Sequence, residues 1–139
     1  MSATASLRYD DVSVGDELPP LEVPLTRTLI VATAIASRDY QDVHHDPTLA
    51  VQRGSKDIFM NILTTNGFVG RFLTDWAGPD ALVRKVSIRL GAPNYPGDTM
   101  EMTGEVTAKD DATRTLTVTL RGRNSLGNHV TGTADVTLP

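Results

Sequence analysis

The sequence predicts an α+β domain in which an antiparallel sheet wraps around one long central helix. Three observations support this class. Four segments in the second half of the chain alternate apolar and polar residues, the segment before them has apolar residues at helical spacing, and turn-forming residues separate them. The 139 residues are enough for a single domain, 1–139, with its own core.

The beginning of the chain is expected to be irregular. Residues 1–8 lack the charged and apolar regions of a signal peptide and are expected to form a flexible tail. The stretch 9–25 contains three prolines and Gly15, which exclude a helix. We therefore predict a turn followed by a short edge strand around 21–25, because an edge strand tolerates proline.

Two helical segments are expected next. Residues 26–37 are rich in apolar and small side chains and are predicted to form a helix that Thr26 or Thr28 caps. Residues 47–52 are predicted to form one helical turn, since Pro47 suits a first helical position and Asp46 suits the cap before it.

The longest periodic segment, 58–76, is predicted to be the central helix. Gly67 and Gly70 lie inside it, and a glycine there costs about 1 kcal/mol relative to alanine. We therefore expect another element to approach the helix closely, and the helix to be buried on most sides. Gly78-Pro79 is expected to end it. The apolar residues that step by three or four are Ile58, Ile62, Thr65, Val69, Phe72 and Trp76.

Four strands are predicted after this helix, each with one apolar face. Their alternating segments lie at about 85–90, 100–106, 115–121 and 130–138. An antiparallel meander is the simplest way to assemble them, and its apolar face would cover the helix.

Composition excludes several classes of function. The net charge is −4 and no basic run occurs, which argues against a nucleic-acid partner. No apolar run is long enough for a membrane span. The absence of cysteine excludes disulfides, thiolate nucleophiles and cysteine metal sites, and is compatible with the expected cytoplasmic location.

The polar loop 37–47 is the candidate site of chemistry, because functional residues concentrate on irregular connections held by a scaffold. In a tight loop Asp39 and His44 can converge on one water, which is what general acid–base catalysis requires. His45 is expected to diverge from His44. A metal bound by the two histidines and a carboxylate is the rival interpretation, but adjacent histidines make poor joint ligands, so no metal is expected.

The chain resembles the MaoC-like hydratase family, which has the hot-dog fold, from about Tyr9 onward. The family motif is Asp, any residue, Asn, Pro, any residue, His, any residue, Asp. Asp39, His44 and Asp46-Pro47 fall on it, while Gln41 replaces the usual Asn and Asp42 the usual Pro.

Four separate blocks are similar to a narrower group, the small MaoC-like subunits of heteromeric steroid side-chain enoyl-CoA hydratases of cholesterol-degrading actinobacteria. That resemblance implies an acyl-CoA substrate, catalysis by Asp39 and His44, no cofactor, and a larger MaoC-like partner. The partner's extra C-terminal domain would dock a retro-aldolase. The blocks are residues 39–46, 54–59, 75–79 and 122–127.

One departure from the family concerns the oxyanion hole. Most members have His-Gly at the start of the central helix, where this chain has Met60-Asn61. A backbone N–H does not require glycine, so the N–H of Asn61 is the candidate donor. Gln41, His45 and Asp46 are candidate supporting residues around the catalytic pair.

Three other functions stay open from the sequence. The chain is alternatively a homodimeric (R)-specific enoyl-CoA hydratase or dehydratase of fatty acyl chains, a hot-dog acyl-CoA thioesterase, or a non-catalytic scaffolding subunit. The presence of both Asp39 and His44 argues against the last two.

Overall fold

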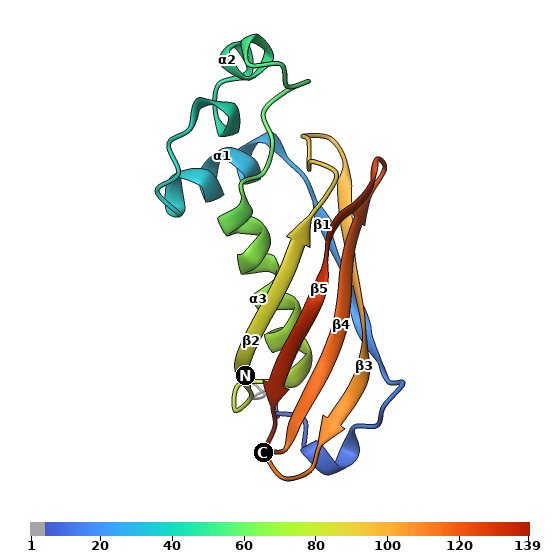
Figure 1. Ribbon diagram of the computed structural model, residues 1–139. Helices are drawn as coiled ribbons and strands as arrows, with labels where there is room; N and C mark the ends of the chain where they lie inside the picture. Colours follow the sequence, from blue (N-terminus) through green and yellow to red (C-terminus); the bar gives the residue numbers. More distant parts are fainter. Residues whose placement is uncertain (1–4) are drawn as a thin grey trace.

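The computed structural model describes residues 5–139, and this part of the chain contains one five-stranded antiparallel sheet and three α-helices. The predicted α+β class is confirmed. Figure 1 shows α3 along one face of the sheet, with α1 and α2 beyond its N-terminal end. The elements are the helices α1 (Arg27–Ala36), α2 (Pro47–Gln52) and α3 (Ile62–Ala77), the strands β1 (Glu17–Pro24), β2 (Leu82–Leu90), β3 (Thr99–Asp110), β4 (Thr115–Asn124) and β5 (Gly127–Thr137), and the 3-10 turns η1 (Tyr9–Asp11) and η2 (Asp42–His44).

The strand order is β1-β3-β4-β5-β2, so the prediction of a simple meander holds for β3, β4 and β5 but is wrong for β2. The chain does not turn back beside β2. Instead the N–H groups of Gly91 and Ala92 bond to the carbonyls of His129 and Asn128, which extends the pairing of β2 with β5. Gly132 of β5 permits this pairing, because a Cβ there would lie 2.2 Å from the Ser87 carbonyl oxygen.

Strand β1 lies at the edge of the sheet, as predicted, but it is longer than the expected 21–25. It pairs with β3 from Glu17 onward, and the register shifts between Leu18 and Leu21. Pro19 and Pro20 fall inside this irregularity, where a missing N–H breaks no ladder bond.

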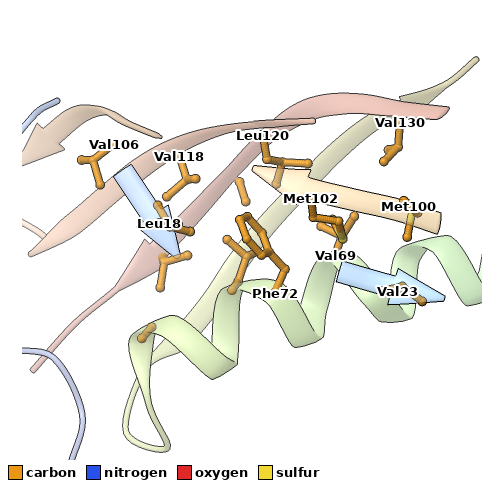
Figure 2. Packing of buried hydrophobic residues seen from close by; sticks show 14 of the residues in the cluster. Leu18, Val23, Val69, Phe72, Met100, Met102, Val106, Val118, Leu120 and Val130 are labelled. Carbon is orange, nitrogen blue, oxygen red and sulfur yellow. The ribbon is translucent and has the colours of Figure 1, made fainter. Parts of the chain in front are cut away.

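The core fills the space between α3 and the inner face of the sheet (Figure 2). Phe72 of α3 is 2% exposed, and a Cβ at Gly104 of β3 would lie only 3.1 Å from its ring. The alternating strand residues therefore meet the helix as the period-two pattern predicts. The strand side chains labelled in Figure 2 are Leu18, Val23, Met100, Met102, Val106, Val118, Leu120 and Val130.

Helix α3 begins at Ile62, four residues later than predicted, because residues 58–60 are bonded elsewhere. The N–H groups of Phe59 and Met60 donate to the carbonyls of Val43 and Asn94, and the Asn61 side chain then caps the helix. None of the helices among residues 5–139 has the length and apolar character needed to cross a membrane.

The prediction that α3 is buried on most sides is wrong, as is the expectation of a close neighbour at its glycines. Ile62 and Leu63 are each 51% exposed, and a Cβ at Gly67 or Gly70 would meet no atom within 4 Å. The reason is that these residues lie on the helix face turned away from the sheet, where an open groove separates α3 from the end of α1.

The predicted α1 and α2 helices are confirmed, with ends that match their caps. Thr26 Oγ1 accepts a bond from the Leu29 N–H at 3.0 Å. Asp46 Oδ1 accepts from the Leu49 N–H, also at 3.0 Å, and Pro47 is the first residue of α2. Both caps satisfy an N–H that lacks a partner inside its helix.

The prediction of a flexible tail over residues 1–8 is wrong for the part that the structure describes, residues 5–8. Residues 1–4 lie outside the described part of the chain. The Leu7 N–H donates to the Ala77 carbonyl at 2.9 Å, and Ser6 Oγ accepts from the Asp80 N–H at 2.7 Å. The sequence shows no pattern for these bonds, since they depend on how the end of α3 lies beside this segment.

Buried His129 provides a pH-dependent contribution to stability. It is 3% exposed; its Nδ1–H donates to the Ala92 carbonyl at 2.7 Å, and its Nε2 accepts from Thr65 Oγ1 at 2.8 Å. Burial lowers the pKa of His129 below its ordinary value of 6.5, although the bond to Ala92 opposes this. As the pH falls below about 6.5, His129 therefore becomes protonated more readily in the unfolded chain than in the folded one. The free energy of unfolding decreases as a result.

We therefore expect the free energy of unfolding to decrease between pH 7.5 and 5.5, and to decrease less in His129→Gln. Urea unfolding of both proteins at the two pH values measures the difference. All other ionisable groups are the same in both proteins, so their contributions cancel in the comparison. The same decrease in both proteins would show that His129 binds its proton equally well folded and unfolded.

Candidate active site

The turn after α1 places Asp39. Ser37 ends the helix, and Arg38 follows in the left-handed conformation with φ of 56°. The Arg38 N–H donates to the Ile35 carbonyl and the Asp39 N–H to the Ala34 carbonyl, which is the Schellman pattern. This turn directs the chain off the helix at Asp39, so the carboxylate sits at the C-terminal end of α1.

Hydrogen bonds hold both oxygens of the Asp39 carboxylate. Oδ2 accepts from Asn61 Nδ2 at 3.1 Å, and Oδ1 accepts from the Gln41 N–H at 3.3 Å. Partial burial raises the pKa of Asp39, but the bonds from Asn61 and Gln41 and the nearby His44 ring outweigh it and keep the pKa below its ordinary value. The carboxylate is therefore ionised at neutral pH.

His44 lies at the end of the 3-10 turn η2 and is buried, with its side chain 8% exposed. Its Nδ1–H donates to the Phe59 carbonyl at 2.7 Å, and the Phe59 ring meets the imidazole edge to face at 4.9 Å. Because a carbonyl oxygen only accepts, Nδ1 holds a proton and Nε2 of the neutral ring has a free lone pair.

His44 Nε2 and Asp39 Oδ2 lie 3.4 Å apart, so the structure brings the two predicted catalytic residues together. A lone pair and a carboxylate at this distance can both accept from one water or substrate hydroxyl. This is the geometry that general acid–base catalysis requires.

Asn61 at the N-terminal end of α3 lies beside this pair and is 2% exposed. Among residues 5–139, no acceptor bonds the backbone N–H groups of Asn61, Ile62 and Leu63. The first turn of a helix leaves such donors free, and its dipole favours negative charge there. The arrangement therefore suits stabilisation of an oxyanion, as the sequence predicts for Asn61.

The three predicted supporting residues lie in different places. Gln41 reaches Asp39 through its backbone N–H only. His45 is exposed and lines a separate surface hollow with Tyr40 and Arg53. Asp46 caps α2 and does not touch the pair. Gln41 thus supports the site through its main chain, while His45 and Asp46 are not brought into it.

Sequence reasoning missed three contributions to the site. Ser37 and Thr64 both bond the Asn61 side chain, and the Phe59 carbonyl selects the tautomer of His44. None of the three left a signal in the sequence beyond Asn61 itself, which is a favourable residue to precede a helix.

An apolar groove of about 330 Å³ adjoins the site. It runs between α1 and α3, and Ser37 and Thr64 form the part of its lining that also bonds Asn61. The open Gly67 and the half-buried Phe68 form its α3 side. The groove therefore offers an apolar surface within reach of the Asp39–His44 pair.

We expect activity to be independent of added metal. Within residues 5–139, no three His, Asp or Glu side chains are grouped so that they could hold an ion, and His45 is exposed whereas His44 is buried. Hydration of an enoyl-CoA by the protein purified with its expected larger MaoC-like partner, before and after chelation, together with elemental analysis, checks this. Activity that chelation removes and zinc or iron restores would contradict it.

Comparison with known proteins agrees with this site and fold. Residues 12–126 match the family described as the MaoC like domain. The chain is 53% identical over 125 residues to the Mycobacterium tuberculosis protein named 3-oxo-4,17-pregnadiene-20-carboxyl-CoA hydratase beta subunit, covering 90% of this chain and 95% of that protein.

Two solved structures are also similar. A chain of the ChsH1-ChsH2 complex from M. tuberculosis superimposes with a TM-score of 0.88 at 52% identity, covering 91% of this chain and 98% of that one. The (R)-hydratase from A. caviae involved in PHA biosynthesis superimposes with a TM-score of 0.85 at 25% identity. The match covers 92% of this chain and 98% of that one. The hot-dog fold is confirmed, and the chain belongs to the MaoC-like family.

Proposed function

We propose that this protein is the catalytic subunit of an enoyl-CoA hydratase that adds water across the 2,3 double bond of a bulky, steroid side-chain enoyl-CoA. The observation that supports it most is the buried His44 Nε2 held 3.4 Å from Asp39, beside the free N–H groups of the α3 N-terminus. The name of the M. tuberculosis relative supplies the substrate class.

The reaction uses one water molecule bound between Asp39 and His44. Both groups accept a hydrogen bond from this water. As its oxygen attacks C3, one of its two protons is transferred to the pair and the hydroxyl group stays on C3. The π electrons of the double bond move to C2 and onto the thioester oxygen, giving an enolate. The pair then returns the proton to C2, so water is added and neither residue is changed.

The enolate oxygen is stabilised by the first turn of α3. The Asn61 N–H donates to it, and the helix dipole favours the developing negative charge. The apolar groove between α1 and α3 takes part of the acyl group, because it begins at Ser37 and Thr64 next to the site. No cofactor takes part, since CoA belongs to the substrate.

We further propose that the active unit is a heteromer with a larger MaoC-like subunit. The M. tuberculosis structure that this chain resembles is a complex of two named components. Within residues 5–139, β2 lies at one edge of the sheet, so its outer side is open to pairing with a strand of a partner. Ile62 and Leu63 at the start of α3 are each 51% exposed, and contact with a partner would bury them.

Two further parts of this proposal follow from the subfamily resemblance. The partner has an additional C-terminal domain, and that domain docks a retro-aldolase, which would consume the hydrated product. The complex acts in the cytoplasm, with which the absence of cysteine is compatible.

The test is to purify the chain alone and together with its larger partner. Mass measurement gives the assembly, and loss of enoyl-thioester absorbance gives hydration of a steroid enoyl-CoA and of a short straight-chain one. We expect the lone chain to self-associate with little or no activity on the steroid substrate, and the heteromer to be fully active.

Two outcomes would contradict the proposal. Full activity of the lone chain on the steroid substrate would favour a homodimeric hydratase. Release of free CoA thiol without formation of a hydroxyacyl-CoA would make the protein a thioesterase. A thiol reagent added to the same assay distinguishes these reactions.

A further inference from the structure

The side chain of Asn61 makes four hydrogen bonds at the centre of the candidate site. Its Nδ2 donates to Ser37 Oγ at 2.9 Å and to Asp39 Oδ2 at 3.1 Å. Its Oδ1 accepts from the Thr64 N–H at 3.0 Å and from Thr64 Oγ1 at 2.5 Å. Asn61 is 2% exposed, so water has little access to its amide.

These contacts determine which way the amide faces. The Thr64 N–H can only donate, so the atom bonded to it must be Oδ1. Nδ2 is then on the other side, and both of its hydrogens are used by Ser37 and Asp39. The capping bond from the Thr64 N–H therefore fixes the amide so that its Nδ2 donor faces the Asp39 carboxylate.

The same amide ties together the elements that form the site. Ser37 Oγ, which accepts from Asn61, donates to the Thr33 carbonyl at 2.7 Å within α1. Asn61 thus joins the C-terminal end of α1, the first turn of α3 and the carboxylate between them. Asp39 Oδ2 has its other neighbour in His44 Nε2, so Asn61 fixes the oxygen that faces the histidine.

We propose that the Asn61 side chain is a positioning residue for catalysis: it holds Asp39 Oδ2 so that this oxygen faces His44 Nε2. This role is separate from that of the Asn61 backbone N–H. It rests on the proposed function, because orienting Asp39 matters for turnover only if Asp39 acts on water.

Two substitutions separate the roles of Asn61. Asn61→Gly keeps the backbone N–H and an acceptable N-cap residue but removes the donor to Asp39. Asn61→Asp keeps an oxygen for the Thr64 bonds but places a carboxylate against Asp39. Asn66→Asp is the matched control, since it makes the same change on the same helix at an exposed side chain that bonds only the Ile62 carbonyl.

In the heteromer we expect Asn61→Gly to lower kcat about 10- to 100-fold at pH 7, as loss of an orienting partner commonly does, with little change in KM. The acidic limb of the kcat–pH profile should move to higher pH, and further in Asn61→Asp, since losing a hydrogen bond to the charged form raises a carboxyl pKa. Asn66→Asp should leave the profile and kcat unchanged.

NMR titration of the Asp39 carboxyl in each variant provides a readout that does not depend on turnover. A higher Asp39 pKa in Asn61→Gly shows that the amide acts on the carboxylate, whichever reaction the protein catalyses, and with a lower kcat it supports the proposal. An unchanged Asp39 pKa together with unchanged kcat overturns it, and so does an equal shift in Asn66→Asp. If Asp39→Asn is inactive while Asn61→Gly is fully active, the proposed function stands and this inference fails.

Discussion

Asp39→Asn and His44→Gln should each reduce hydration about 10²- to 10⁴-fold in the heteromer, the range that general acid–base groups contribute. Asparagine keeps the shape of the carboxylate but cannot take a proton, and glutamine has no basic nitrogen in place of Nε2. The double variant should be little worse than either single variant, because the two groups act on one water. Loss of enoyl-thioester absorbance measures all three.

The neighbouring histidine provides the control. His45→Gln makes the same change one residue away, at an exposed side chain outside the pair. We expect it to keep near-normal turnover, and circular dichroism should show all four variants folded. Near-normal turnover in Asp39→Asn or His44→Gln would remove that residue from the mechanism, and strong loss in His45→Gln would mean that the wrong histidine has been assigned.

Phe72→Ala should reduce the free energy of unfolding by about 3–5 kcal/mol. The ring is 2% exposed between α3 and the sheet, and the absence of a side chain at Gly104 makes room for it. Removing the ring leaves a cavity that the strands cannot close without breaking their pairing with one another. A loss of this size is a large part of the stability of an ordinary domain.

Urea unfolding followed by circular dichroism, at one fixed protein concentration, measures this loss. Phe68→Ala on the same helix is the matched control, because Phe68 is only half-buried beside the open groove. Phe68→Ala should reduce the free energy of unfolding clearly less than Phe72→Ala does. Equal losses for the two variants would show that Phe72 does not fill the core as the packing indicates.

Local patterns in the sequence predicted most of the elements and the two residues, Asp39 and His44, that the structure brings together. Alternation in the last third of the chain marks β3, β4 and β5, because neighbouring residues of a strand face opposite sides. Thr26 and Asp46 mark helix starts through bonds that span only three residues. Asp39 and His44 lie in one short loop, so their meeting depends on few backbone angles and their motif is recognisable.

Contacts between residues far apart in the chain were decided only by the tertiary structure. The sequence by itself predicted a helix over 58–76 with glycines that face a neighbour, yet the open face of α3 follows from the sheet covering only its other side. The place of β2 beside β5 depends on the crossing by residues 91–98. The Asn61–Asp39 bond spans 22 residues and has no periodicity to reveal it, because it exists only once the C-terminal end of α1 lies beside the first turn of α3.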